Sequence, residues 1–275
     1  MRKYLSIVML AILFGLTSCE ELKEDLGLKD PSKDQNDQNK GEENKPQVSI
    51  NKSPSAYFTF DGNYEDLSGT DKYAYGNPEP TFVSGPVSGK KAIAFSRSNM
   101  TKVVVNDGLI DTPSMTISLW IKDVSEGDIF WVTSTNSFSY TTKMMSLKYT
   151  NGHLKYTFKR SSNHTDLNGG NYGNFTHKVL DDGDWHHIAL VSDYNTVNAE
   201  KVTTTLYVDG IYMDTQTEPC STYDENKDAE KHFGTGTKFV MGGDNTPNMK
   251  IANLRVYDEW QLPESEIKNL YTKKL

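Results

Sequence analysis

The chain has 275 residues, of which 36% are hydrophobic and 11% aromatic, and its formal net charge is −8. A nucleic-acid partner is not expected, because phosphate contacts need clustered lysine and arginine and the basic residues form no such stripe. The chain has two cysteines, Cys19 and Cys220, which are too few for a cysteine metal cluster.

The first 18 residues have the layout of an export signal. Arg2 and Lys3 precede an apolar segment over residues 4–16, which is shorter than the roughly 20 apolar residues of a membrane-spanning helix. The run that ends in Cys19, Leu-Thr-Ser-Cys, resembles the lipobox of bacterial lipoproteins, whose cysteine becomes the first mature residue and carries acyl chains. We therefore expect a signal peptide over 1–18, a lipid on Cys19 that anchors the protein in the outer membrane, and a free thiol at Cys220. The alternative is a cleaved secretory peptide with an incidental cysteine.

A polar linker is predicted over residues 19–52. It contains no aromatic residue and few aliphatic ones, so it cannot bury enough apolar area to offset the entropy of ordering. Its first residues, 20–25, form an acidic cluster that resembles the surface-export signal of lipoproteins in the Bacteroidota. This resemblance implies exposure at the cell surface; an ordinary charged tether facing the periplasm is the alternative.

One all-β domain is predicted over residues 53–275. Apolar and mostly polar residues alternate over residues 115–122, as in a strand with one buried face. The dipeptides Asn151-Gly152 and Asp209-Gly210 favour two-residue hairpin turns. A single helix is expected over residues 263–272, with proline in its first turn. Strands are predicted over residues 56–60, 92–95, 102–105, 115–122, 129–133, 144–149, 154–159, 185–192, 203–208, 211–217, 238–241 and 249–256.

Several segments resemble, in their order along the chain, the laminin-G-like domains of the concanavalin A-like lectin and glucanase group. The resemblance implies an antiparallel jelly-roll sandwich of two sheets, one of them concave and often ligand-binding. This agrees with the alternation, which predicts a sandwich or a barrel independently. The segments are residues 56–63, 66–69, 115–122, 184–189, 206–210 and 251–257, followed by Leu262 and by Glu266-Ile267.

A structural calcium ion is expected at the turn over residues 61–66, which is rich in the oxygen donors that calcium prefers. The resemblance implies such an ion, with Asp61 and Asp66 as its ligands. However, the family's acidic residue on the last strand is replaced here by Ala252. A turn held by Asp and Asn side chains without metal is therefore the alternative.

Adjacent histidines follow Trp185 in the sequence. His186 and His187 should point to opposite faces of a strand, so they cannot converge on one metal ion. The resemblance implies a structural role for this motif, with Trp185 as a packing residue and His187 at a core-facing position.

Glycoside hydrolysis was considered because it occurs on the same type of sandwich. It needs two carboxylates that flank the scissile bond, and the related enzymes carry the pattern Glu-x-Asp-x-x-Glu. The nearest match begins at Glu126 and Asp128 but has Trp131 in place of the last acid. No catalytic residues are therefore assigned, and a non-enzymatic protein is expected.

Binding of extracellular carbohydrate, without cleavage, is the expected function. Saccharide sites combine aromatic side chains with polar hydrogen-bonding groups, and such residues gather in 161–175 and near Phe138. Solvated loops are the alternative explanation for these segments, and a protein-contacting adhesion module is the alternative function. The expected partners are a glycan or a surface protein and the membrane through the lipid, and a monomer is expected. The ligand-binding candidates are Tyr140, His164, Asp166, Asn171 and Tyr172.

Overall fold

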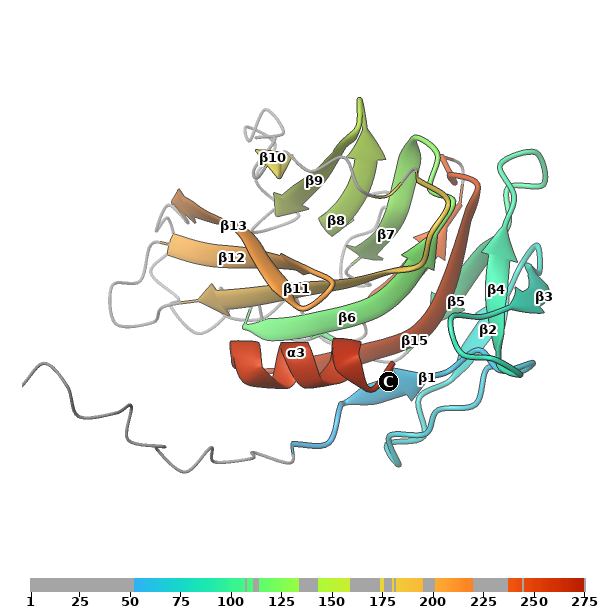
Figure 1. Ribbon diagram of the computed structural model, residues 1–275, viewed down its shortest axis with the longest axis horizontal. Coiled ribbons are helices and arrows are strands. Elements are labelled where there is room, and N and C mark those ends of the chain that lie inside the picture. The colour runs from blue at the N-terminus through green and yellow to red at the C-terminus, as the bar shows by residue number, and fades with distance from the viewer. Residues whose placement is uncertain are drawn as a thin grey trace, which may run out of the picture. The chain divides into compact units, whose positions relative to one another are not determined.

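Two antiparallel sheets form the part of the chain that the computed structural model describes (Figure 1). Contacts divide the chain into two units, Met1–Ile50 and Asn51–Leu275, and every described residue belongs to the second unit. The expected signal peptide, Cys19 and most of the linker lie outside the described residues. The described residues are 52–106, 108–110, 114–133, 143–158, 174–175, 180, 182–194, 201–219, 237–243 and 245–274.

The first sheet has the strand order β13-β12-β11-β6-β15-β4-β3, and β1 pairs with β15. Strand β15 therefore has β6 on one side, and β4 and β1 in succession on the other. The strands are β1 (Ala56–Phe58), β3 (Thr81–Ser84), β4 (Lys91–Phe95), β6 (Met115–Lys122), β11 (His186–Tyr194), β12 (Lys201–Val208), β13 (Ile211–Pro219) and β15 (Met249–Asp258).

The second sheet has the order β10-β9-β8-β7-β14-β5-β2. Its strands are β2 (Ala74–Gly76), β5 (Lys102–Val105), β7 (Gly127–Thr133), β8 (Lys143–Thr150), β9 (His153–Phe158), β10 (Asn174–Phe175) and β14 (Lys238–Gly242). The predicted strands are thus found, and the two-sheet antiparallel jelly-roll sandwich is confirmed. Strands β2, β3 and β10 were not predicted, because each has at most four residues and too little alternation to stand out.

The core lies between the two sheets and is built from alternate residues of each strand. Phe58 and Phe60 come from one sheet and Phe130 and Phe239 from the other, and all four side chains are fully buried. Phe130 stacks on Phe239 with ring centroids 4.9 Å apart. Because side chains alternate between the two faces of a strand, the residues between these core positions point outward.

The helix α3 (Glu264–Thr272) covers part of the outer face of the first sheet (Figure 1). It begins one residue later than predicted, because Pro263 has an extended backbone conformation and is the N-cap instead of a residue of the first turn. Ile267 and Leu270 pack against Ala189, Tyr257 and Leu262 in a second apolar cluster, separate from the core between the sheets. This part of the face is therefore closed to large ligands. None of the helices in the described ranges is long and apolar enough to cross a membrane.

The two predicted hairpin turns are confirmed by their backbone angles. Asn151 and Gly152 have φ of 52° and 75° between β8 and β9, and Asp209 and Gly210 have 53° and 72° between β12 and β13. Positive φ at both central positions is what a type I′ turn requires, and Asn-Gly and Asp-Gly adopt it at low cost.

Candidate functional site

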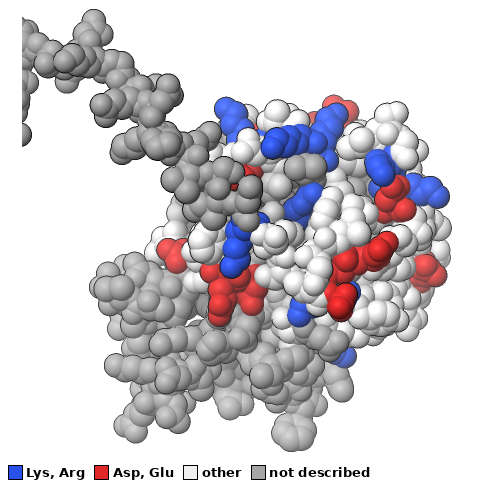
Figure 2. Space-filling model, turned by 90° about the horizontal axis from the view of Figure 1, so that it is seen from below, with Lys and Arg blue, Asp and Glu red and all other residues white. Residues whose placement is uncertain are grey.

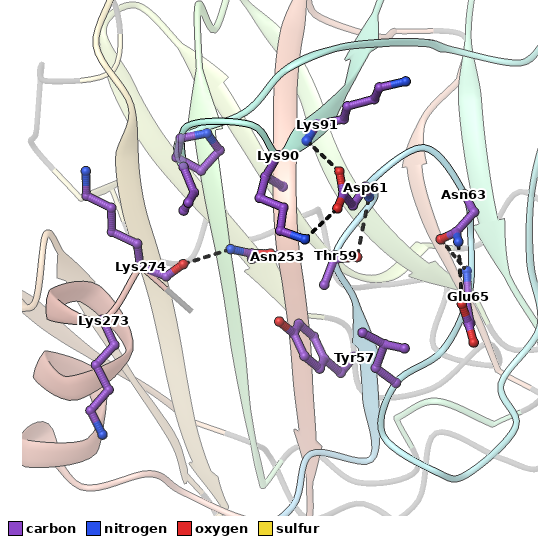
Figure 3. Close-up of a pocket in the computed structure, with 14 residues that line it drawn as sticks. Tyr57, Thr59, Asp61, Asn63, Glu65, Lys90, Lys91, Asn253, Lys273 and Lys274 are labelled. Carbon is purple, nitrogen blue, oxygen red and sulfur yellow. Dashed lines mark hydrogen bonds and ion pairs between the residues drawn. The ribbon is translucent and has the colours of Figure 1, made fainter.

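A pocket of about 520 Å³ opens beside β1, on the outer side of the first sheet (Figure 3). Three parts of the chain line it: β1 with the turn after it, the turn between β3 and β4, and the end of α3 together with the middle of β15. In Figure 3 the side chain of Lys90 points toward Asp61, and the lysines that follow α3 lie on the opposite side of the pocket. The lining residues are Tyr57, Thr59, Asp61, Asn63, Glu65, Leu67, Pro86, Val87, Lys90, Lys91, Ala252, Asn253, Lys273 and Lys274.

Side chains alternate between two faces along β1 and the residues after it, and this alternation places every second side chain at the pocket. Ala56, Phe58 and Phe60 are fully buried in the core, whereas Tyr57 and Thr59 between them line the pocket. At Phe60 the backbone enters the left-handed region with φ of 60°, which is uncommon for an aromatic residue. The chain turns there while the phenyl ring stays buried, so the odd-numbered residues that follow continue along the pocket wall.

Asn253 reaches the pocket because β15 contains a bulge. Its pairing with β6 shifts between Ala252 and Arg255, so Asn253 and Leu254 together face the single residue Leu119. Asn253 has φ of 52°, a conformation that asparagine tolerates better than most residues. Its Nδ2 donates a hydrogen bond to the carbonyl oxygen of Lys274 at 3.1 Å, which ties the end of α3 to the pocket.

The ring of Tyr57 is the aromatic surface of the pocket. The guanidinium carbon of Arg255 lies 3.8 Å from the ring centroid, at the distance of a close cation–π contact. Arg255 is 4% exposed, and burial lowers the pKa of its guanidinium. It does not line the pocket, so it supports the tyrosine ring from behind. Arg255 therefore covers one side of the tyrosine ring, and only the rest of the ring is available to a ligand.

Asp61 is held by the two lysines of the β3–β4 turn. Its Oδ2 accepts a hydrogen bond from Lys90 Nζ at 2.9 Å, and its Oδ1 accepts one from the backbone N–H of Lys91 at 2.9 Å. The hydrogen bond from Lys90, followed by that from Lys91, lowers the pKa of the Asp61 carboxyl below its ordinary value. The carboxylate is therefore ionised at neutral pH and paired with an ammonium group.

Asp66 organises the turn after β1 and does not line the pocket. Its Oδ1 accepts hydrogen bonds from the backbone N–H groups of Tyr57 and Ser68, at 2.9 and 3.0 Å. Its Oδ2 accepts from the backbone N–H of Lys72, at 2.9 Å, and from the hydroxyl groups of Ser68 and Thr70. Burial raises the pKa of this carboxyl, but the three backbone hydrogen bonds together outweigh burial and the pKa is lowered.

These contacts do not fit a calcium site at Asp61 and Asp66. Calcium takes about 6 to 8 oxygen ligands, and here the carboxylate oxygens are engaged by N–H, ammonium and hydroxyl donors. Among the described residues no group of three or more His, Cys, Asp and Glu side chains is arranged to hold a metal ion. Ala252 adds no donor side chain to the pocket wall. Calcium at this turn stays a prediction of the sequence.

The two histidines of β11 lie on opposite faces, as the alternation predicts. His186 bonds through Nδ1 to Asp209 Oδ2 at 2.8 Å and through Nε2 to Asp182 Oδ1 at 3.0 Å. His187 is fully buried and shares a hydrogen bond of 2.8 Å between its Nε2 and the hydroxyl of Ser118. It lies under α3, on the outer face of the first sheet, and not between the sheets as the family resemblance implied.

Glu126 lies directly before β7 in the second sheet and has a structural role there. Its Oε1 accepts a hydrogen bond from the backbone N–H of Asn151 at 2.9 Å, which stabilises the β8–β9 hairpin. Asp128 lies in β7 and is 7% exposed. Glu126 is therefore a structural residue of this hairpin.

The ligand-binding candidates from the sequence cannot be placed. Tyr140, His164, Asp166, Asn171 and Tyr172 lie outside the described residues, as do Cys19 and Cys220. In contrast, the four lysines of the pocket were not predicted as site residues. Lysine pairs at 90–91 and 273–274 are visible in the sequence, but nothing in the sequence indicates that they lie at one pocket.

Solved structures with the same fold include several binding domains. Domain 4 of AbnA, a GH43 extracellular arabinanase from Geobacillus stearothermophilus solved with arabinotriose, is 17% identical with a TM-score of 0.54; the match covers 80% of this chain and 98% of that one. The binding domain of botulinum neurotoxin DC, solved with SialylT, is 15% identical with a TM-score of 0.53; the match covers 82% of this chain. The chain spans about half of that toxin domain, 53% of its length. The binding domain of Paraclostridial Mosquitocidal Protein 1 is 16% identical, with a TM-score of 0.51 and coverage of 80% of this chain and 51% of that one.

Comparison with curated proteins gives no match. A family model described as the concanavalin A-like lectin/glucanases superfamily, Laminin_G_3, matches residues 97–268, which is more than half of the chain. Both sheets and α3 contribute to the matched range. The chain therefore belongs to the Laminin_G_3 family of the concanavalin A-like lectin/glucanase superfamily.

Proposed function

We propose that this protein binds extracellular carbohydrate without cleaving it, and that the pocket beside β1 is a saccharide site. The observation that carries the proposal is the pocket itself, in which a supported tyrosine ring lies near the polar side chains of Asn253 and Asn63. Sugars present apolar C–H faces and rims of hydroxyl groups, so an aromatic surface with amides beside it matches both. The volume of about 520 Å³ lies within the range of about 300 to 1,000 Å³ that is usual for small-ligand sites.

The related structures support a binding role. One of them is a domain of an arabinanase in complex with arabinotriose, and this chain covers 98% of that domain. The neurotoxin DC binding domain was solved once with SialylT and once with rat synaptotagmin II, a protein. A glycan ligand is therefore the first proposal and a protein ligand the second.

Absence of hydrolysis is part of the proposal. Retaining and inverting glycosidases need two carboxyl groups that flank the bond, one of them able to donate a proton. In the pocket, Asp61 is paired with Lys90 and its pKa is lowered, which makes it a poor proton donor. Glu126 lies at the hairpin turn that it stabilises. Asp61 and Glu126 therefore do not form a pair of carboxyl groups that could flank one glycosidic bond.

Display at the cell surface completes the proposal. Acyl chains on Cys19 would hold the protein at the outer membrane, since each buried CH₂ group contributes about 0.8 kcal/mol and two or more chains anchor firmly. The linker over 19–52 would then separate the binding domain from the membrane. In fractionated host cells, Cys19→Ala should move the protein out of the membrane fraction; a variant that still pellets with membranes would exclude this anchor.

Calorimetry with the full-length chain tests the saccharide site. Arabinotriose and a panel of host and plant oligosaccharides are titrated into the protein and into two pocket variants, Tyr57→Ala and Asn253→Gly. The glycine keeps the positive φ and removes the amide. Tyr73→Ala is the control, because Tyr73 is 62% exposed and lies outside the pocket.

Both pocket variants should weaken binding of any saccharide ligand, whereas the control should not. Product analysis after long incubation should find no released oligosaccharides. Binding to a protein partner with no glycan binding would favour the adhesion module, and release of oligosaccharides would show a hydrolase.

A further inference from the structure

The residues that line the pocket carry a net positive charge, whereas the whole chain is negatively charged. Four lysines and two acids line the pocket, whereas the chain has a net charge of −8. Charges more than about 8 Å away are largely screened at physiological ionic strength, so the local groups decide which ligands are attracted. In Figure 2, which views the side of α3 and β1, basic side chains predominate in the upper half and acidic ones in the lower half.

One of the four lysines is neutralised and three are not. Lys90 is paired with Asp61 at 2.9 Å. The ammonium groups of Lys91, Lys273 and Lys274 form no ion pair with any carboxylate of the described residues. All three side chains are exposed. In Figure 3 the two lysines after α3 and Lys91 lie on opposite sides of the pocket.

Arg255 adds a buried positive charge behind the aromatic ring. It is 4% exposed, and its Nη1 is buried without a hydrogen-bond partner. Within the described part of the chain its pKa is affected by Tyr57 and Tyr257, and no ion pair joins it to a carboxylate there. A buried guanidinium is ordinarily paired with an acid, because desolvation of an unpaired charge is costly. Here the cation faces the ring of Tyr57, and the ring faces the pocket.

We infer that the pocket prefers acidic saccharides, those that carry a carboxylate or a sulfate group, over neutral ones. This inference rests on the proposed saccharide function and specifies its ligand. The apolar face of one sugar ring would lie on Tyr57, and the acidic group would face Lys273 and Lys274 or Lys91. All the lining residues except Ala252 and Asn253 lie outside residues 97–268, so the family match by itself does not imply this preference.

Matched pairs of oligosaccharides test the inference by calorimetry on the full-length chain. An oligogalacturonide is compared with its methyl ester, which removes the carboxylate charge. A heparin oligosaccharide is compared with its desulfated form, which removes the sulfate groups. In at least one pair the member with the additional acidic groups should bind about tenfold more tightly, as expected when two or three exposed ion pairs form. Which pair responds identifies the carboxylate or the sulfate as the recognised group.

The double variant Lys273→Gln and Lys274→Gln should remove most of that difference in affinity within the pair. Lys268→Gln is the matched control, because it neutralises a lysine of α3 that does not line the pocket. Raising the salt concentration should weaken the acidic member selectively. Equal affinities within both pairs would overturn the acidic preference while keeping the saccharide function. Binding of no saccharide at all would overturn both.

Discussion

The guanidinium of Arg255 lies 3.8 Å from the ring centroid of Tyr57 and joins the outer face of β15 to the pocket beside β1. The two residues are direct partners in the strand pairing, because Tyr57 is opposite Arg255 in the register of β1 with β15. Cross-strand neighbours on one face come close enough for their side chains to interact. The aromatic surface of the pocket is therefore supported by the sheet itself.

Replacing Tyr57 should destabilise the protein as well as impair binding. Tyr57→Ala removes the ring that faces a buried cation, and a desolvated cation–π contact contributes about 2 kcal/mol. Tyr57→Phe keeps the ring and should retain most of the unfolding free energy. Denaturant unfolding measures both, with the exposed Tyr73→Ala as control. Equal stability of Tyr57→Ala and the native chain would show that the contact with Arg255 contributes nothing.

Chelation should leave the melting temperature unchanged. The ammonium of Lys90 bonds Asp61, and Asp66 is saturated by backbone and hydroxyl donors, so both of the predicted calcium ligands are already engaged. A bound calcium ion at a hundredfold excess over its Kd would add about 2.7 kcal/mol. Thermal melts with calcium and with a chelator test whether the ion is bound. If the chelator lowers the melting temperature and Asp61→Ala abolishes that effect, the calcium predicted from the sequence is present.

His186 should make the stability fall as the pH rises above 6.5. Burial lowers the pKa of its imidazole, but the hydrogen bonds that it donates to Asp182 and Asp209 outweigh burial and raise the pKa above 6.5. A raised pKa in the folded state means that the stabilisation is complete below pH 6.5 and is lost as the pH rises through the folded pKa. Urea unfolding from pH 6 to 9 should show this decline, and His186→Gln should remove it. A decline of the same size in the variant would assign the effect to another group.

His187 should have the opposite effect to His186, because it should make the stability fall as the pH decreases. Burial, and then the charge of Arg255, lower the pKa of its imidazole to about 3, from 6.5. The folded state therefore keeps His187 neutral where the unfolded chain takes up a proton, so the stability falls as the pH drops below 6.5. The expected loss is about 2 kcal/mol between pH 6.5 and 5. An NMR titration should find the imidazole of His186 titrating above pH 6.5 and that of His187 constant from pH 8 to 5; titration of His187 within this range would contradict its burial.

Trp120, rather than Trp185, should be the tryptophan on which stability depends. Trp120 is 3% exposed and packs against the rings of His187 and Tyr271, whose centroids are 5.4 and 5.8 Å away. Trp185 is only half-buried and packs at the edge of the same cluster. Trp120→Ala should cost about 3 to 5 kcal/mol, as for other buried aromatics. Trp185→Ala should cost clearly less, and a larger loss for Trp185 in denaturant unfolding would reverse the assignment.

The sequence by itself predicted most of the strands, two hairpin turns and the helix, because these depend on neighbours in the chain. The alternation of Met115 to Lys122 indicates which face of β6 meets the other sheet, although the expectation of a single buried face is wrong, because the opposite face is buried as well. Asp209-Gly210 is a dipeptide that adopts positive φ at low cost. The family resemblance, seen in segments of the same kind, was confirmed by the match over residues 97–268.

Only the tertiary structure decided where His187 lies and which residues form the pocket. The alternation of side chains along β11 shows that His187 and Trp185 share a face of the strand. It does not show whether that face packs against the other sheet or against a helix, and in the structure it packs under α3. The pocket joins Tyr57, Lys90 and Lys273, which are far apart in the sequence, and Asn253 enters it through a bulge that no local pattern marks. Side chains from distant segments meet through strand pairing and helix packing, and these long-range contacts leave no signal in the residues next to any one of them.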